Sequence, residues 1–159
     1  MLQKLYIANY AIIEELSVDF SQGLNVITGE TGAGKSIIMG ALSLILGERA
    51  ESSALFNKEK KCVVEASFEA RGNEAVMLFL KANELDNEEL LLIRREIAVN
   101  GKSRAFINDT PVNLAQLKAI TSLLVDLHQQ FDTLELGDDE LQRQLLDGLA
   151  GNLELLTEY

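Results

Sequence analysis

The chain has 159 residues, enough for one domain with a real core, and its 47% hydrophobic and 25% charged residues suit a soluble globular protein. A net charge of −11 argues against a surface that binds nucleic acid throughout, although it leaves room for a local basic patch. No apolar run approaches the roughly 20 residues of a membrane span, and Asn9 and Glu14 interrupt the first apolar segment too early for a signal peptide. The single cysteine, Cys62, excludes an internal disulfide, fits a reducing cytoplasm and is expected to be a small strand residue rather than a nucleophile.

Two strands are expected at the start of the chain, over residues 2–8 and 12–20. In the second, Leu16, Val18 and Phe20 alternate with polar residues, which is the period of a half-buried strand. A turn at residues 21–23 then leads into Leu24–Thr28, an apolar run that predicts a buried strand. Strands placed ahead of the motif that follows favour an ATPase of the ABC type over a simple kinase or small GTPase.

A complete phosphate-binding motif, GxxxxGK[ST], follows this run. It consists of Gly29, Glu30, Thr31, Gly32, Ala33, Gly34, Lys35 and Ser36. Its glycines let backbone N–H groups surround phosphate oxygens, Lys35 supplies a cation for the β- and γ-phosphates, and the Ser36 hydroxyl is a ligand for Mg²⁺. Residues 37–46 predict a helix whose N-terminus points at the phosphates. A strand before and a helix after the motif favour a nucleotide site over a simple glycine-rich turn.

The middle of the chain predicts a mixed α/β domain with an antiparallel section. Residues 47–61 are polar and irregular, residues 62–68 alternate as a strand, and Asn73 is placed to cap a helix that runs through Met77, Leu80 and Leu85. A strand at 90–99 meets the hairpin signal Asn100-Gly101, and a returning strand at 103–107 is followed by a turn at 108–111. Asn113 and Gln116 form a capping-box pattern before a helix over 114–120.

Near residue 126 two interpretations compete. Residues 123–128 predict a short strand that ends in polar groups, and Asp126 could then be the metal-binding carboxylate of a Walker B strand. An ABC-type Walker B strand needs a glutamate next, however, and Leu127 stands there without an LSGGQ-like signature before it. We therefore favour the second interpretation, in which the strand delivers Gln130 to the nucleotide, where its amide coordinates Mg²⁺ and contacts the attacking water. His128 is expected to be an ordinary strand-end histidine rather than a group beside the metal.

The last residues predict a helix that opens with acidic residues at 138–140. Leucines at 146, 149, 153 and 156 recur at spacings of three, four and three, which fits either a short coiled-coil seam or an ordinary amphipathic helix.

Several sequence blocks together resemble the RecN family, the bacterial SMC-like DNA repair ATPases. The resemblance rests on the blocks at residues 7–12, 23–36, 46–50, 100–108 and 124–130, and it covers nearly the whole chain. It implies a P-loop NTPase fold of the ABC/SMC head type, of which this chain resembles the N-terminal lobe with an antiparallel section. Residues 1–137 are then expected to form half of the ATPase head, and residues 138–159 the start of a coiled-coil helix.

The resemblance also implies ligands and partners. Gly29 to Ser36 would hold the triphosphate of ATP, with Ser36 and Gln130 on Mg²⁺, and Lys35 and Gln130 as the catalytic groups. Members more often carry Gly and His around the glutamine, where this chain has Gln129 and Phe131. Expected partners are the C-terminal half of the same head, a second head and DNA, in the cytoplasm and at the nucleoid, with no membrane.

The signature motif, Walker B aspartate, catalytic glutamate and switch histidine belong to the C-terminal half in this family and are not found in these residues. The chain alone is therefore expected to bind nucleotide weakly and to hydrolyse ATP negligibly. Two other classes stay open: a small-molecule P-loop phosphotransferase with Asp126 as metal ligand, and a nucleotide-gated interaction module without turnover. Basic residues at 58, 60 and 61, or at 94, 95, 102 and 104, could form a small DNA-facing patch, although solvated charges are the simpler explanation.

Overall fold

The computed structural model describes residues 1–28, 32–49, 55–86 and 88–126. Residues Met1–Val125 form one compact unit of six strands and three helices among those described. In chain order the elements are β1 (Leu2–Tyr10), β2 (Ile13–Asp19), α1 (Gly32–Ile45), β3 (Cys62–Glu69), α2 (Glu74–Ala82), β4 (Leu90–Ile97), β5 (Ser103–Ile107), β6 (Thr110–Val112) and α3 (Leu114–Ser122).

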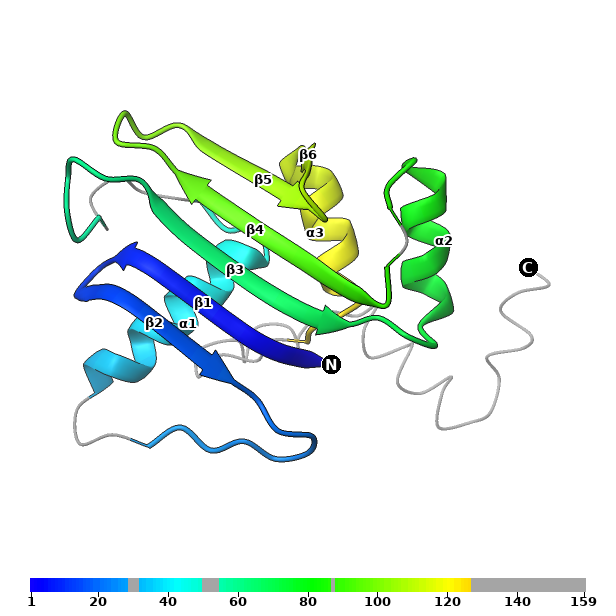
Figure 1. Cartoon of the computed structure of the whole chain (residues 1–159), viewed down its shortest axis with the longest axis horizontal. Helices are drawn as coiled ribbons and strands as arrows, with labels where there is room; N and C mark the ends of the chain where they lie inside the picture. Colours follow the sequence, from blue (N-terminus) through cyan, green and yellow to red (C-terminus); the bar gives the residue numbers. More distant parts are fainter. Residues whose placement is uncertain (29–31, 50–54, 87, 127–159) are drawn as a thin grey trace, which may run out of the picture. The chain divides into compact units, whose positions relative to one another are not determined.

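The strands form one sheet in the order β2-β1-β3-β4-β5-β6, and every neighbouring pair is antiparallel (Figure 1). The two predicted early strands are confirmed as β1 and β2. The β4–β5 hairpin turns at Asn100-Gly101 as predicted, with Gly101 at a φ of 78°. The next turn uses Asn108 and Asp109 at φ values of 44° and 64°, and it leads into β6, a short edge strand that the sequence did not predict. Pro111 is tolerated there because an edge strand leaves one side of its backbone unpaired.

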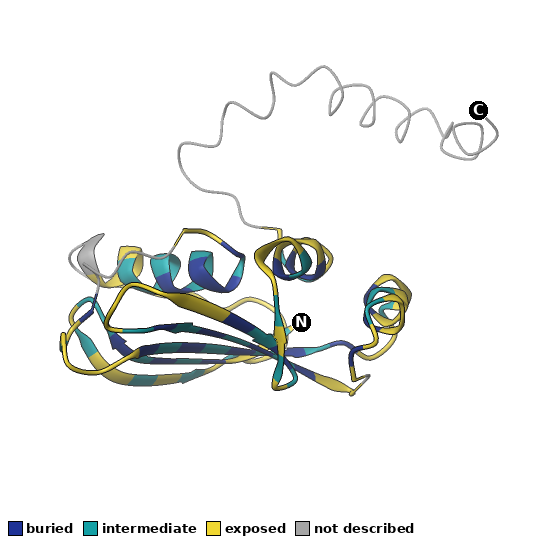
Figure 2. Ribbon diagram, turned by 90° about the horizontal axis from the view of Figure 1, so that it is seen from above, coloured by how far each residue is buried: buried dark blue, intermediate teal, exposed yellow. Residues whose placement is uncertain are grey.

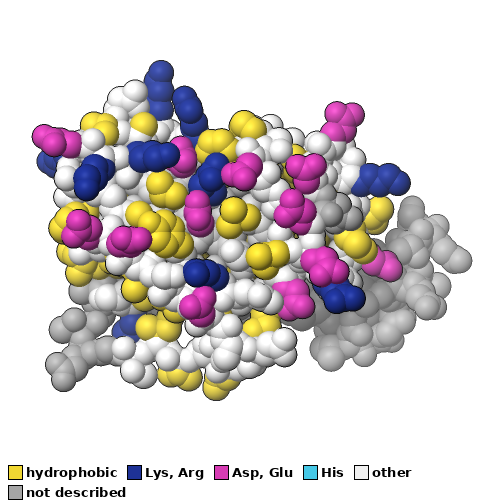
Figure 3. Space-filling view, in the orientation of Figure 1, with side chains coloured by type: hydrophobic (Ala, Val, Ile, Leu, Met, Phe, Trp, Pro, Cys, Tyr) yellow, Lys and Arg dark blue, Asp and Glu magenta, His cyan; other side chains and the backbone are white. Residues whose placement is uncertain are grey.

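Helices cover one face of this sheet and leave the other open to solvent (Figure 2). Helix α1 packs on β3 and β4, and α3 packs on β5. Burial alternates along β3, where Cys62, Val64, Ala66 and Phe68 lie at 0% exposure beneath the helices, as the sequence predicts. The open face carries Lys and Arg interspersed with Asp and Glu (Figure 3). This is the usual division of an antiparallel sheet with one buried face.

Local capping signals in the sequence are confirmed. The Asn73 side chain accepts a hydrogen bond from the Val76 backbone N–H at 3.2 Å and begins α2, which ends at Ala82, before Leu85. At α3, the Asn113 side chain accepts from the Gln116 N–H at 2.9 Å, and the Gln116 side chain accepts from the Asn113 N–H at 3.1 Å. Such reciprocal bonds satisfy two backbone donors that a helix start otherwise leaves unpaired.

Two predicted strands are wrong in the described residues. Leu24–Thr28 is irregular, and Leu24 and Val26 are 89% and 72% exposed, because no described strand lies beside it to pair with its backbone. The run from Leu123 continues the last turn of α3 instead, with the Leu124 and Val125 N–H groups both bonded to the Thr121 carbonyl. The expected helix at residues 138–159 lies outside the described part of the chain.

Candidate nucleotide-binding site

The phosphate-binding motif leads directly into α1, which begins at Gly32. Gly29, Glu30 and Thr31 lie outside the described residues, whereas Gly34, Lys35 and Ser36 form the exposed first turns of the helix. The first turn carries no acidic side chain. Because the N–H groups of a helix start have no partner within the helix and its dipole is positive there, this end attracts an anion. Lys35 adds a full positive charge at the same place.

An apolar hollow of about 230 Å³ adjoins Lys35. Its walls come from the β1–β2 turn and β2 on one side and from the start of α1 on the other. The lining consists of Ile12, Ile13, Leu16, Ile27, Thr28, Gly34, Lys35, Ile37 and Ile38. The hollow therefore combines a broad apolar wall with one cationic end, a combination common in small-molecule sites.

Helix α1 is fixed to the sheet along its middle and C-terminal part. Ala41 and Ile45 are fully buried, and Gly40 faces Tyr10, whose hydroxyl lies 2.7 Å from the position that a Cβ at residue 40 would take. The helix ends at Ile45, and the chain after it is capped: the Gly47 N–H bonds the Leu44 carbonyl at 3.2 Å and the Glu48 N–H bonds the Ser43 carbonyl at 2.9 Å. This is a Schellman motif with glycine in the left-handed position, at a φ of 93°. The anchored body of α1 thus holds the exposed residues Gly34, Lys35 and Ser36 at the start of the helix. The Tyr10–Gly40 contact was missed from sequence, although a glycine inside a helix is a signal of close approach.

Of the other predicted site residues, the structure describes only Asp126. Asp126 follows α3 but does not end a strand, and Gln130 and His128 lie outside the described residues. Within residues 1–126, apart from the gaps, no group of three or more His, Cys, Asp and Glu side chains could hold a metal ion. Of the two metal ligands in the favoured interpretation, Ser36 and Gln130, the structure describes Ser36, whose hydroxyl is the hard oxygen donor that Mg²⁺ prefers.

Cys62 is an inert core residue, as predicted. Its side chain is fully buried in β3, and burial raises the pKa of its thiol to about 11. The thiolate that a nucleophile requires is therefore scarce at neutral pH.

The second set of basic residues does not form a single patch. Arg94 lies on the open face of β4, where its guanidinium is 3.0 Å from an Asp109 carboxylate oxygen and 4.5 Å from the centre of the Phe106 ring. Arg95 points to the opposite face and is 1% exposed. Among the first set, Lys61 pairs with Glu96 at 2.9 Å. In the part of the chain that the structure covers, no helix is long and apolar enough to cross a membrane.

Comparison with known proteins shows the family to which the chain belongs. A family model described as "AAA domain" matches residues 4–156. The chain is 44% identical over 156 residues to the DNA repair protein RecN of Vibrio cholerae serotype O1, covering 98% of this chain and 28% of that protein. It is 43% identical over 152 residues to the RecN of Bacillus subtilis strain 168, covering 95% and 26%. The resemblance predicted from sequence is confirmed, and the chain spans less than a third of these relatives.

Solved structures show the fold. A chain from the study "Structural biochemistry of ATP-driven dimerization and DNA stimulated activation of SMC ATPases" matches with a TM-score of 0.64 at 21% identity, covering 91% of this chain and 96% of that one. The SMC head domain from Thermotoga maritima matches with a TM-score of 0.53 at 23% identity, covering 74% of this chain and 40% of that one. The expected fold, an α/β P-loop ATPase head with an antiparallel section, is thereby confirmed.

Proposed function

Because the chain belongs to the family described as the AAA domain, we propose that it is the ATP-binding half of an SMC-like ATPase head that acts in DNA repair and recombination. One observation carries the proposal: Lys35 stands exposed at a helix start that has no acidic side chain, beside an apolar hollow. A helix dipole, unpaired N–H groups and a lysine together suit the negative charge of a triphosphate. The names of the RecN relatives support the DNA repair role.

In this proposal ATP lies across the start of α1. Gly29 to Ser36 surround the triphosphate, with Lys35 on the β- and γ-phosphates. The nucleobase occupies the apolar hollow, where contact with Ile13 and Leu16 of β2 removes its faces from water. Ser36 and Gln130 supply oxygen ligands for Mg²⁺, which would neutralise phosphate charge when bound.

Hydrolysis then proceeds by in-line attack of water on the γ-phosphate. Lys35 stabilises the charge that spreads over the phosphate oxygens, and the Gln130 amide orients the water. The chain lacks a catalytic glutamate and a signature motif, so the proposed site is half of a composite one. The C-terminal half of the head and a second head would supply the rest, with DNA as a partner of the whole assembly in the cytoplasm.

The exposure of the segment before the motif supports the proposal that the site is half of a composite one. Leu24 and Val26 are largely exposed on an extended stretch that feeds the phosphate-binding motif, and Ile27 is 44% exposed. Exposed apolar residues in a row are costly in water and mark surfaces that a partner covers. The matched relatives, which are more than three times as long as their aligned part, have sequence to cover it. We therefore expect the 159-residue chain alone to hydrolyse ATP negligibly.

A Lys35→Ala variant tests the site. Isothermal titration with ATP and Mg²⁺ should show at least a tenfold loss of affinity, since about 1.4 kcal/mol corresponds to a factor of ten and a charge-assisted phosphate contact exceeds that. Lys4→Ala is the matched control, because Lys4 lies at the far end of β1 from the hollow and makes only an exposed 3.8 Å ion pair with Asp19. Equal ATP binding by Lys35→Ala and the parent would refute the assignment.

A separate measurement tests whether the chain alone hydrolyses ATP. Phosphate release by the purified chain should not exceed that of Lys35→Ala, because a contaminating ATPase would contribute equally to both. Turnover that Lys35→Ala abolishes would contradict the composite-site proposal while supporting nucleotide binding. The alternative of a small phosphotransferase that uses Asp126 loses its main support, because residues 123–126 do not form the strand that was to deliver this carboxylate.

A further inference from the structure

A single arginine interrupts an otherwise apolar row that crosses all six strands. The register aligns Leu16, Ile7, Val64, Arg95, Ala105 and Val112 from β2 to β6. Arg95 therefore occupies a core position on the helix-covered face and is 1% exposed. A charged side chain at such a position costs several kcal/mol unless an opposite charge and hydrogen bonds compensate it.

The described contacts of Arg95 do not compensate this charge. Its guanidinium has five N–H donors, but among the described residues it makes one long hydrogen bond, 3.5 Å from Nη2 to the Glu48 carbonyl. The Nε atom is buried and has no hydrogen-bond partner. No carboxylate of the described chain forms an ion pair with Arg95, in contrast to Arg94 on the opposite face of the same strand. Burial also lowers the pKa of the Arg95 guanidinium, although arginine remains charged near neutral pH.

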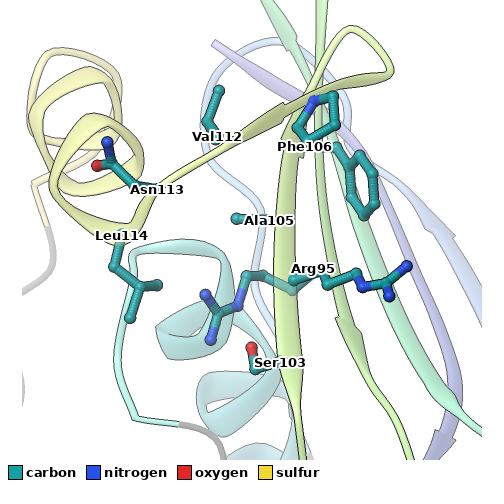
Figure 4. Close-up of a pocket in the computed structure, with 9 residues that line it drawn as sticks. Arg95, Ser103, Ala105, Phe106, Val112, Asn113 and Leu114 are labelled. Carbon is teal, nitrogen blue, oxygen red and sulfur yellow. The ribbon is translucent and has the colours of Figure 1, made fainter.

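A hollow of about 420 Å³ lies against this side chain, between the edge of β5 and the segment that leads from β6 into α3. Figure 4 shows the Arg95 side chain extending toward the helix side of the sheet, with Ser103, Ala105 and Leu114 around it. None of the nine lining residues is acidic, in a chain with 25 acidic and 14 basic residues. Arg95 supplies the cation of this hollow, because Arg104 stands opposite Glu96 in the register and so belongs with the open face of the sheet.

We propose that this hollow is an oxyanion-binding site in which Arg95 holds a compact phosphate or carboxylate group. The planar guanidinium offers two parallel N–H donors, which match the two oxygens of either group. The Nε–H, which has no partner in the structure, is a further donor for such a ligand. Ser103 lines the same space and adds a hydroxyl group, whereas the Asn113 side-chain oxygen accepts a hydrogen bond from the Gln116 N–H at the start of α3.

This site is separate from the proposed nucleotide site. Arg95 lies beside Glu48, just beyond the C-terminal end of α1, whereas Lys35 lies at its start. A helix of 14 residues is about 21 Å long, so one phosphate group cannot contact both side chains. A purely structural role for Arg95, as a cation at the C-terminus of α1, would satisfy part of its charge but would not respond to added anions.

The test follows the Nε–H resonances of Arg95 and Arg94 by proton–nitrogen NMR on the full 159-residue chain. The chain carries Lys35→Ala, which removes the main cation of the nucleotide site, and inorganic phosphate or acetate is added at constant ionic strength against chloride. We expect a saturable shift of the Arg95 Nε–H resonance, with half-saturation at about 1–10 mM, a range typical of weak single-anion sites. The Arg94 Nε–H resonance, from a side chain already ion-paired on the open face, should shift no more than it does in chloride.

Each outcome decides the proposal. A shift with phosphate alone, acetate alone or both supports the site and identifies which oxyanion it takes. A shift of Arg95 that equals that of Arg94, or that never saturates, overturns it. As a second measurement, phosphate should raise the melting temperature of the Arg94→Met chain but not of the Arg95→Met chain. If Arg95→Met fails to fold, Arg95→Lys keeps the charge without the planar fork and should weaken phosphate binding several-fold.

Discussion

Replacing Asn9 should destabilise the chain more than any ordinary surface substitution, because this side chain holds a loop by three hydrogen bonds. Asn9 is 6% exposed and has a left-handed φ of 57°. Its Nδ2 donates to the Asn57 carbonyl at 3.0 Å and to the Lys60 carbonyl at 2.8 Å, and its Oδ1 accepts from the Asn57 N–H. The next residue, Tyr10, contacts α1 at Gly40, so Asn9 also fixes the strand end that supports the nucleotide-site helix.

The expected loss of stability has two separate contributions, the lost hydrogen bonds and the backbone strain. Each intramolecular hydrogen bond contributes a net of about 1 kcal/mol, so the loss of three costs about 3 kcal/mol. Alanine in the left-handed region costs about 1–2 kcal/mol, whereas glycine pays no such penalty. Asn9→Gly should therefore lower the free energy of unfolding by about 3 kcal/mol, and Asn9→Ala by about 4–5 kcal/mol.

Urea unfolding of both variants, followed by circular dichroism, measures these differences. Ala11→Gly is the matched control, because Ala11 also has a positive φ, 53°, and glycine there removes strain without touching the loop. Its stability should stay within about 1 kcal/mol of the parent. An Asn9→Gly variant within about 0.5 kcal/mol of the parent would show that the three hydrogen bonds add nothing net, and equal stability of the two Asn9 variants would refute the strain term.

Two further predictions concern the buried thiol and the end of α1. Burial raises the folded-state pKa of Cys62 from 9.0 to about 11, so the contribution of its neutral thiol to stability is present below pH 9 and is lost as pH rises toward 11. Unfolding experiments across this pH range should show a loss of about 2–3 kcal/mol in the free energy of unfolding, and Cys62→Ala should remove that loss. The same pH dependence of stability in Cys62→Ala as in the parent would contradict the assignment. Gly47→Ala should lower the stability of the chain more than Gly72→Ala does. Both glycines have a positive φ, but only a Cβ at residue 47 would meet another group, since it would lie 2.6 Å from the Lys118 Cγ. Thermal unfolding should place the two about 1 kcal/mol or more apart, and adding Lys118→Ala should close that gap if the contact is its cause.

Local chemistry explains why much of the fold could be predicted from the sequence. The alternation on β3 and the caps at Asn73 and Asn113 depend on neighbours within a few residues, and the structure confirms them. The Asn100-Gly101 hairpin is local in the same sense, because a tight turn requires residues that accept a positive φ. The phosphate-binding motif is also local, since it consists of consecutive residues, and its ligand stays a prediction.

Longer-range relations could not be predicted in the same way. An apolar run such as Leu24–Thr28 indicates burial, but burial requires a neighbouring strand, and the described chain has none beside it. The run from Leu123 is equally apolar, yet local hydrogen bonds to Thr121 extend the turn of α3 and override strand propensity. Hydrophobic periodicity alone does not distinguish these outcomes for short runs.

Arg94 and Arg95 show most clearly the difference between what the sequence determines and what the tertiary structure decides. The sequence by itself places both arginines in one predicted strand, over residues 90–99, and in one candidate basic patch. Alternation along the strand instead sends adjacent side chains to opposite faces of the sheet. Only the tertiary structure decided which face the helices cover, and hence that Arg94 is an ion-paired surface group while Arg95 is buried beside a hollow. The reason is physical: strand alternation is a local property of the backbone, whereas burial and charge compensation depend on side chains that folding brings from distant parts of the chain.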